Sequence, residues 1–246
     1  MLECYALSKS FGGVEALRDF SVSFPGAGAI GIIGPNGSGK TTLLNLITGF
    51  SAPNHGYCRW EGAIITNRSP HEVCRLGVSR TFQDLRLCPA LPAIDHVLIA
   101  FPDQPNESLA ATLFKWNPHD SDSRARVLAM EILKLVGIEG KSRAEAANLS
   151  YGQQKLLALA CCIATRGKVL LLDEPVAGID PTLRRTVQDL IKELAKDQLV
   201  IVVEHDMDTI RTTCNRTLLL SAGEVIGFGP TAEILNSQIT VDAYLR

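Results

Sequence analysis

The clearest pattern in this chain is a set of short, almost continuously apolar runs separated by stretches with helical spacing. The runs cover residues 29–33, 168–172 and 199–203. Strands that are apolar on both sides are typical of a parallel sheet covered by helices on both faces. Between the last two runs, Asp180-Pro181 is a capping residue followed by proline, which predicts a helix start. The apolar face of that helix is expected to consist of Leu183, Val187, Leu190, Ile191 and Leu194. The pattern therefore predicts an α/β core.

The beginning and the end of the chain are patterned differently. Short strands are predicted at 2–7, 20–24 and 57–61, and residues 62–65 are predicted to turn the last of these back. These strands are expected to be antiparallel edge strands. A hairpin around residues 222–223 and a short helix from Thr231 are expected to close the chain.

The middle of the chain, from residue 84 to about 148, holds several prolines and then a helical pattern. The apolar positions of that pattern are Leu128, Ile132, Leu135 and Val136. Gly137 is well placed to end the helix, and the polar residues 117–123 are expected to form a loop. This section is predicted to be a mostly helical insertion in the core.

The predicted organisation is therefore one domain over residues 1–246. Its core begins with an antiparallel β subdomain over 1–83, a helical subdomain is inserted over about 84–165, and the core continues over 166–246.

Composition excludes some classes of function. The formal charge is −2, so the chain lacks the basic field that attracts DNA or RNA, and no nucleic-acid partner is expected. No apolar run approaches the roughly 20 residues that a membrane span needs, and the first residues do not resemble a signal peptide. The seven cysteines have no metal-binding spacing and are expected to be free thiols in a reducing compartment.

One stretch between a predicted strand and a predicted helix carries a specific chemical signal. It consists of Gly34, Pro35, Asn36, Gly37, Ser38, Gly39, Lys40, Thr41 and Thr42. This is a phosphate-binding P-loop in its required context. The glycines let the backbone curl around an anion, and the helix start and Lys40 add positive charge. Thr41 places a hydroxyl where a phosphate-bound magnesium needs an oxygen ligand. The stretch predicts binding of a nucleoside triphosphate.

Three further polar residues lie at the ends of predicted strands, where ligands of open parallel sheets bind. Asp173 is expected to hold magnesium directly or through water, and Glu174 to orient or deprotonate an attacking water. His205 is expected to reach the terminal phosphate. Each has a structural alternative, because Asp-Glu-Pro often forms a turn and a single histidine is usually a satisfied surface or core residue. Their combination with the P-loop favours the functional interpretation.

A second helix start could also face an anion. Ser150 is a natural cap for the helical run that follows it, and Gly152 permits close approach to the helix N-terminus. The residues leave two interpretations open. The first is an ordinary capped helix, and the second is a helix that faces a phosphate held by another copy of the chain.

In this order, these motifs resemble those of the ATP-binding-cassette (ABC) ATPases, and the resemblance covers essentially the whole chain. The matching parts are 34–41 for Walker A, Gln83 for the Q-loop, 149–153 for the signature, 169–174 for Walker B, 177–180 for the D-loop and His205 for the switch histidine. Tyr151 is a departure, because it occupies the usual place of the first signature glycine.

The resemblance implies a P-loop NTPase fold and a set of roles. Two subunits are implied to pack head to tail, so that each signature completes the site of the other subunit. Lys40 and the loop amides would grip the β- and γ-phosphates of ATP, and Thr41, Gln83 and Asp173 would coordinate Mg²⁺. Glu174 would act as catalytic base, with His205 at the γ-phosphate. Further nucleotide contacts are implied for Phe11, which would stack on adenine, and for Ser150, Gly152, Gln153 and Asp180. Phe11 has an alternative, since an aromatic residue before Gly-Gly can simply pack on a strand.

Softer features resemble the ATPase subunits of branched-chain amino acid importers and their urea/amide relatives. They are residues 80–83, 113–116, 151–154, 204–207 and 243–245. Lipopolysaccharide-export ATPases share the ending, and a soluble, non-transport ATPase of the superfamily is a further alternative. The resemblance implies a cytoplasmic subunit, peripheral at the inner face of the cell membrane, that powers separate transmembrane permease subunits. Gln83, at the junction of core and helical lobe, is the implied coupling residue.

Overall fold

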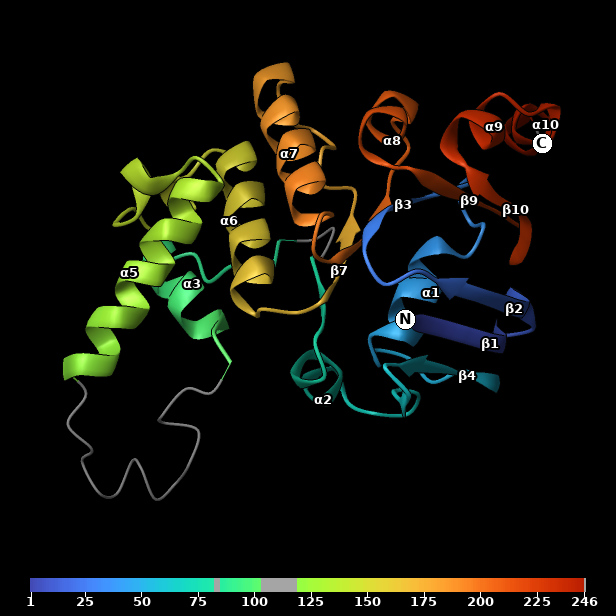
Figure 1. The fold of residues 1–246 in the computed structure, drawn as a ribbon, viewed down its shortest axis with the longest axis horizontal. Helices are drawn as coiled ribbons and strands as arrows, with labels where there is room; N and C mark the ends of the chain where they lie inside the picture. The colour runs from blue at the N-terminus through green and yellow to red at the C-terminus, as the bar shows by residue number, and fades with distance from the viewer. Residues whose placement is uncertain (82–84, 103–118, 246) are drawn as a thin grey trace. The chain divides into compact units, whose positions relative to one another are not determined.

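The computed structural model describes residues 1–81, 85–102 and 119–245. The chain forms two compact units (Figure 1). The first comprises Met1–Gln83, Gly167–Ala177 and Gln188–Arg246, and the second comprises Asp84–Arg166 and Gly178–Val187. Among the described residues, the strands form two sheets of four and six strands, and both sheets belong to the first unit.

The four-stranded sheet is antiparallel. Across it lie β2 (Val14–Phe24), β1 (Leu2–Phe11), β4 (His55–Trp60) and β5 (Ala63–Ile64). The predicted edge strands are confirmed, but β1 and β2 are longer than the apolar pattern indicated. They extend to the turn at Gly12-Gly13, since their outer parts pair with each other while their side chains stay largely exposed.

The six-stranded sheet contains the apolar runs. Its order is β10 (Glu224–Pro230), β9 (Arg216–Ser221), β3 (Gly28–Ile33), β8 (Leu199–Val203), β7 (Val169–Asp173) and β6 (Val78–Arg80). All neighbours are parallel except β9 and β10, which form the predicted hairpin. Every residue of β7 and β8 is buried, which explains why these strands read as continuous apolar runs.

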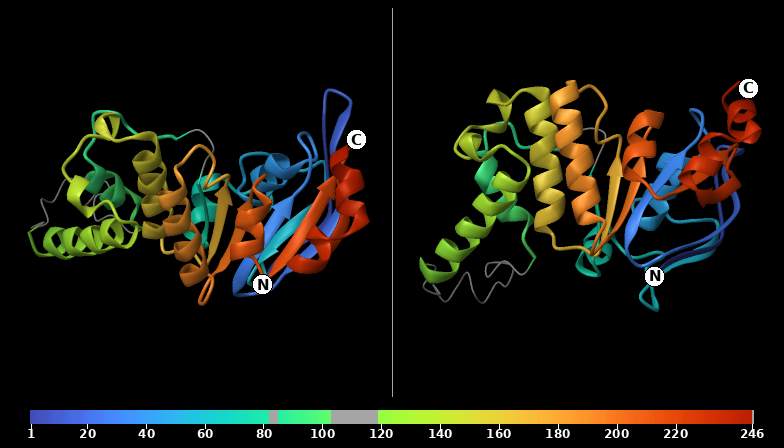
Figure 2. Two further views of the ribbon diagram at one scale, coloured as in Figure 1. Left: turned by 90° about the horizontal axis from the view of Figure 1, so that it is seen from above. Right: turned by 45° about the horizontal axis from the view of Figure 1, so that its top comes forward.

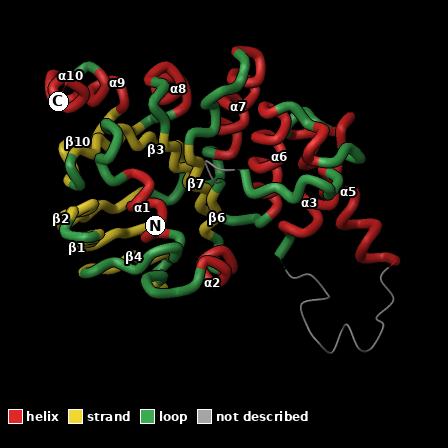
Figure 3. The backbone as a smooth tube through the Cα atoms, turned by 180° about the vertical axis from the view of Figure 1, so that it is seen from behind, coloured by secondary structure: helices red, strands yellow, loops and turns green. Residues whose placement is uncertain are grey.

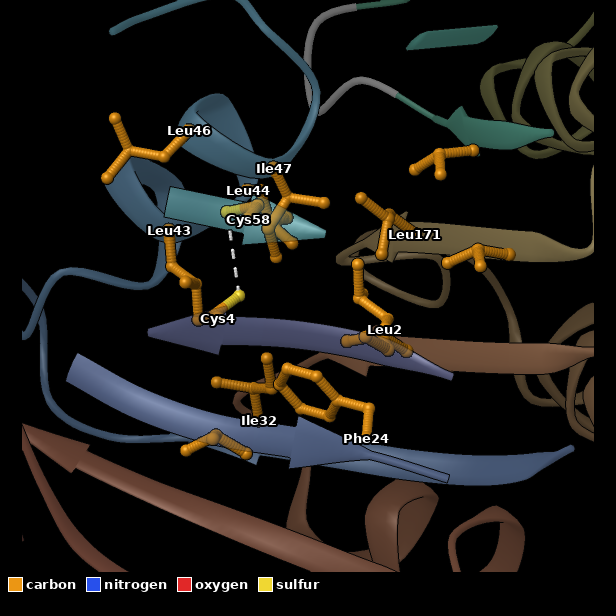
Figure 4. Close-up of a cluster of buried hydrophobic side chains, with 14 of the residues drawn as sticks. Leu2, Cys4, Phe24, Ile32, Leu43, Leu44, Leu46, Ile47, Cys58 and Leu171 are labelled. Atoms are coloured by element: carbon orange, nitrogen blue, oxygen red, sulfur yellow. Dashed lines mark hydrogen bonds between the residues drawn. The ribbon is translucent and has the colours of Figure 1, made fainter. Parts of the chain in front are cut away.

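The core of the first unit lies between the two sheets and includes helix α1 (Lys40–Ile47). In Figure 4, Leu43, Leu44 and Ile47 of α1 lie with Leu2 of β1 and Ile32 of β3 in one buried cluster. Alternate residues of a strand face opposite sides of the sheet. A side chain at position 31 would accordingly meet Ile210 of helix α8 (Met207–Thr213) on the other face, at 2.9 Å. The sheet is therefore covered on both faces, as predicted.

Among the described residues, four further helices belong to the first unit (Figures 2 and 3). They are α2 (Pro70–Arg75), α8 (Met207–Thr213), α9 (Thr231–Leu235) and α10 (Gln238–Leu245). The first two begin at side-chain caps: Ser69 and Glu72 form a capping box on α2, and Asp206 caps α8. Helix α9 is the predicted helix from Thr231, and α10 follows it.

The second unit is helical in its described part. Helices α3 (Ala93–Ala100), α5 (His119–Leu135) and α6 (Tyr151–Ala164) pack on one another, with 3₁₀ turns at Glu139–Lys141 and Ala146–Asn148. Helix α7 (Pro181–Leu194) runs from the second unit into the first. Across the described ranges, none of the helices combines the length and apolar character that a bilayer crossing requires.

Two expectations about α5 were wrong. Residues 119–123 are helical rather than a loop, because polarity indicates exposure and not conformation, and acidic residues are favourable in a first helical turn. Ala129 and Leu133 of α5 are buried, as is Val136 directly after the helix, whereas Leu135 is 47% exposed. Gly137 follows the helix with a φ of 78°, as predicted for a terminating glycine.

The packing of the central sheet predicts a large stability effect at Leu171, which is fully buried in β7. Leu171→Ala is expected to lower the free energy of unfolding by about 2–5 kcal/mol, because it leaves a cavity between closely packed strands. A urea titration followed by circular dichroism measures this change. Ile64→Ala is the control, since Ile64 is 54% exposed, and equal losses in both variants would contradict this description of the core.

Candidate functional site

Three neighbouring parallel strands end at the same level of the central sheet. Ile32 of β3 lies opposite Val203 of β8, and Val203 lies opposite Asp173 of β7. The P-loop follows β3, Glu174 follows β7, and His205 follows β8 by two residues. The segments that carry the predicted chemistry therefore leave the sheet side by side, although they are far apart in the sequence.

These segments enclose a cavity of about 340 Å³. It is lined by Ala16, Asn36, Gly37, Ser38, Gly39, Lys40, Thr41, Thr42, Asp173, Glu174, Val203 and His205. The structure thus brings together most of the predicted P-loop residues with the predicted carboxylates and histidine. Ala16 and Val203 were not predicted, because they contribute ordinary small or apolar side chains with no chemical signal.

Lys40 is buried at the start of α1, and its ammonium group is held by its own loop. Nζ donates to the carbonyl oxygens of Gly34 at 2.7 Å and Pro35 at 2.9 Å, and it lies 3.4 Å from Ser38 Oγ. Burial lowers the pKa of Lys40, and the nearby Glu174 and Asp173 carboxylates oppose this shift. Gly34 and Pro35 therefore contribute to the site through backbone carbonyls that position the lysine, rather than by lining the cavity.

The start of α1 is suited to an anion. Its capping position is Gly39, with a φ of 105°, and no side chain of the described residues caps the helix. A Cβ at this position would lie 2.4 Å from the carbonyl oxygen of Ala16, so only glycine fits. The first-turn N–H groups of a helix have no partner within the helix, and together with the helix dipole they attract negative charge.

Asp173 forms a buried ion pair that the sequence analysis did not identify. Arg80 Nη2 donates to Asp173 Oδ2 at 2.8 Å, and the two side chains are 5% and 3% exposed. The same guanidinium donates through Nη1 to Asn45 Oδ1 on α1, at 2.7 Å. Arg80 therefore fixes one oxygen of the carboxylate and links β6, β7 and α1.

The oxygen donors in the cavity fit a magnesium ion. Mg²⁺ prefers hard oxygen ligands, usually one or two protein groups completed by phosphate oxygens and water. Thr41 and Asp173 offer a hydroxyl and a carboxylate on the wall of the same cavity. Gln83, the third predicted ligand and the predicted coupling residue, lies outside the described residues.

Glu174 and His205 lie next to each other just after the ends of β7 and β8. His205 Nε2 is 3.4 Å from Glu174 Oε1. Glu174 has a φ of 50° and its N–H donates to Val203 O at 2.9 Å, so the residue occupies a left-handed conformation of the kind that clusters at functional sites. The buried Glu204 carboxylate accepts from Val176 N and His205 N, at 2.8 and 3.2 Å. It therefore ties the loop after β7 to the loop after β8.

Phe11 lies at the end of β1 and does not line the cavity. Its side chain is 50% exposed, and Lys9 Nζ lies 4.9 Å from the centre of its ring. Half of the Phe11 side chain is therefore accessible to solvent, and both its contact with adenine and its packing on a strand stay predictions.

The predicted signature residues form an N-terminal cap on α6. Ser150 Oγ accepts from Gln153 N at 3.3 Å, and Gln153 Oε1 accepts from Ser150 N at 3.0 Å, which is a capping box. A Cβ on Gly152 would lie 2.6 Å from Leu183 Cδ1, so a larger residue here would have to displace the end of the Leu183 side chain. Asp180 Oδ1 accepts from Thr182 N at 2.9 Å and caps α7. The capped-helix interpretation holds within one chain, and a role toward a second copy stays a prediction.

Tyr151, the departure from the usual signature, lies partly exposed on the first turn of α6. Its side chain is 51% exposed, and a side chain at Gly178 would meet its ring at 3.1 Å. The tyrosine therefore packs over the backbone of the segment that precedes α7, and the cap made by Ser150 and Gln153 forms in its presence.

Comparison with known proteins places these features in a family. The family model described as "ABC transporter" matches residues 17–177. The high-affinity branched-chain amino acid transport ATP-binding protein BraF of Pseudomonas aeruginosa is 33% identical over 248 residues, covering 100% of this chain and 97% of that protein.

Two solved structures are also similar over nearly the full length. An ATP-binding cassette of an ABC transporter in its ADP conformation has a TM-score of 0.84 and 30% identity, covering 100% of this chain and 98% of the other. A dimeric ATP-binding cassette in a post-hydrolysis state, bound to ADP and Pi, has a TM-score of 0.79 and 26% identity, covering 94% and 99%. The fold, the order of the motifs and these similarities agree, and the chain belongs to the ABC transporter family.

Proposed function

We propose that this chain is the ATP-binding and ATP-hydrolysing subunit of an ABC importer and that it powers separate membrane permease subunits. The observation that carries the proposal is that the P-loop and Lys40 line one cavity together with Asp173, Glu174 and His205. A phosphate-binding loop alone supports binding, whereas the added carboxylates and histidine support hydrolysis.

The triphosphate would lie along the P-loop and the start of α1. Amides of residues 36–42 and the Lys40 ammonium would hold the β- and γ-phosphates, since this part of the chain lines the cavity. Lys40 is anchored to two carbonyls of the loop, which hold its charge beside the proposed phosphate position. Phe11 would stack on the adenine from the end of β1.

The water that attacks the γ-phosphate would lie between that phosphate and Glu174. The Glu174 carboxylate would orient the attacking water and accept its proton, and His205, 3.4 Å away, would contact the γ-phosphate. Magnesium, held by Thr41, Asp173 and Gln83, would supply neutralisation of phosphate charge. Arg80 supports this arrangement because it holds Asp173 in a fixed orientation.

The complete site would require two ATPase subunits in a head-to-tail pair. A dimeric cassette with ADP and Pi is among the similar structures, which supports pairing of this chain with a copy of itself or with a related ATPase. Ser150, Gly152 and Gln153 at the start of α6 would reach the phosphate of the partner subunit, with Asp180 nearby. The proposed contact would place that phosphate at the N-terminal end of this 14-residue helix, where the helix dipole favours an anion.

The working assembly would lie at the cytoplasmic face of the membrane. We propose that residues 1–246 act as one domain, in which the helical part, residues 84–165, passes the motion of the core to the permease through Gln83. The names of relatives such as BraF support branched-chain amino acids as the transported class.

Removal of the P-loop charge tests nucleotide binding. Lys40→Ala is expected to weaken ATP affinity by about 10- to 100-fold, because charged hydrogen bonds to the phosphates are lost. Equilibrium binding of a fluorescent ATP analogue measures the change. Lys168→Ala, at a side chain that is 70% exposed, is the control, and an unchanged affinity of Lys40→Ala would contradict the proposed site.

Neutralisation of the proposed base separates binding from hydrolysis. Glu174→Gln is expected to bind ATP normally, to dimerise with it, and to release phosphate about 100-fold more slowly or worse, because general-base catalysis is lost. Phosphate release and analytical ultracentrifugation provide the two measurements. Glu61→Gln, at a side chain that is 53% exposed, should behave as wild type. Near-normal turnover of Glu174→Gln would instead assign the base to another residue.

Transport by the assembled complex tests the proposed substrate class. Membrane proteins that co-purify with this chain are expected to include a permease, and vesicles containing the complex with a matching solute-binding protein should take up leucine when ATP is supplied on the side of this subunit. Complexes with Lys40→Ala should show no ATP-dependent uptake. An ATP-driven complex that transports other solutes but not branched-chain amino acids would refute this substrate class.

A further inference from the structure

The last helix of the chain contacts the first residue of the P-loop. The N–H of Gly34 donates to the hydroxyl oxygen of Tyr244, on α10, at 2.8 Å, and 210 residues separate the two in sequence. Tyr244 belongs to the Ala-Tyr-Leu ending of the chain, to which the proposed ATP chemistry gives no role. The contact joins the end of the chain to the loop that begins the proposed nucleotide site.

Gly34 stands where the P-loop leaves β3, and its surroundings allow little freedom. The residue is buried, and a Cβ there would lie 2.0 Å from the carbonyl oxygen of Leu220. A buried N–H without an acceptor would cost folding free energy, so the tyrosine hydroxyl satisfies a group that the loop must bury. This hydrogen bond fixes the peptide plane between Ile33 and Gly34.

The next peptide group carries the link to the lysine. The carbonyl oxygen of Gly34 accepts from Lys40 Nζ at 2.7 Å. Gly34 is therefore held from both sides, by Tyr244 at its N–H and by Lys40 at its carbonyl. A rotation at Gly34 would move the carbonyl that positions the Lys40 ammonium.

Helix α10 is anchored by contacts that do not involve this hydroxyl. Thr240 Oγ1 donates to Ile234 O of α9 at 2.6 Å, and Ala243 and Thr240 are buried. Burial raises the pKa of Tyr244, and the Gly34 hydrogen bond opposes this shift; the phenol therefore stays neutral at ordinary pH. The helix and the hydroxyl can accordingly be perturbed separately.

We propose that Tyr244 is a positioning residue of the nucleotide site: its hydroxyl fixes Gly34, and through it the carbonyl that orients Lys40, so that helix α10 forms part of the P-loop's support. The inference rests on the proposed function for the identity of the ligand, because the positioned lysine is the one that would hold the phosphates. It adds a contribution from the end of the chain that the P-loop pattern does not contain.

Tyr244→Phe tests the inference, because it removes one oxygen and keeps the ring. We expect the Kd for ATP to rise about fivefold, the effect of one hydrogen bond. The loss should appear in the KM for ATP rather than in kcat at saturation, because the hydroxyl acts on binding. Thr240→Val is the matched control, since it removes a hydroxyl from the same helix without touching Gly34. It should leave the Kd for ATP within about twofold of wild type. Equal weakening by both variants would assign the effect to helix docking and overturn the inference.

A second measurement follows the Gly34 N–H itself and needs no nucleotide. Amide exchange of ¹⁵N-labelled protein, read by NMR, should be faster at Gly34 in Tyr244→Phe by about tenfold and unchanged in Thr240→Val. Wild-type exchange at Gly34 in Tyr244→Phe would overturn the inference. A wild-type chain that binds no ATP would refute the proposed function and, with it, the role given to Tyr244. Unchanged ATP affinity in Tyr244→Phe would refute that role alone.

Discussion

Three parallel strands that stop at one level are the constraint on which the rest of the molecule depends. Strand β8 lies between β3 and β7. Its residue Val203 pairs with Ile32 of β3 on one side and with Asp173 of β7 on the other. The segments that follow these strands therefore leave the sheet next to one another. The continuous burial of β7 and β8 holds this register, since a slip of one residue would exchange the two packed faces.

The charged groups Lys40 and Asp173 at this edge of the sheet have polar partners within the protein. Lys40 is directed onto carbonyl oxygens of its own loop, and Asp173 is paired with Arg80 in a nearly water-free environment. A buried ion pair is costly unless its geometry is good and its remaining groups are hydrogen-bonded. The second guanidinium contact, to Asn45, supplies part of that compensation. The cavity thus has positively and negatively charged side chains held in fixed positions. Such preorganised groups stabilise charge that develops in a site from which water is excluded.

The site could be predicted from the sequence where its residues are neighbours in the chain, and not where they are far apart. The P-loop residues are contiguous, so their spacing alone identifies them, and Asp173 and Glu174 follow an apolar run that marks a strand end. Arg80 could not be assigned, because its partner is 93 residues away and β6 has only three residues, too few for a pattern. The helical start of α5 could not be predicted for a different reason: a run of polar residues has no apolar stripe, so the same sequence pattern fits a helix and a loop. Leu135 shows the same limit, since regular spacing identifies an apolar stripe but not its edges.

The buried carboxylate of Glu204 has a mechanical consequence. One of its oxygens accepts from the amide of Val176 and the other accepts from the amide of His205. The segments that carry Glu174 and His205 are therefore joined through one carboxylate. Displacement of one segment relative to the other must lengthen or break one of these two hydrogen bonds. The positions of Glu174 and His205 are therefore linked through Glu204, a residue that does not itself line the cavity.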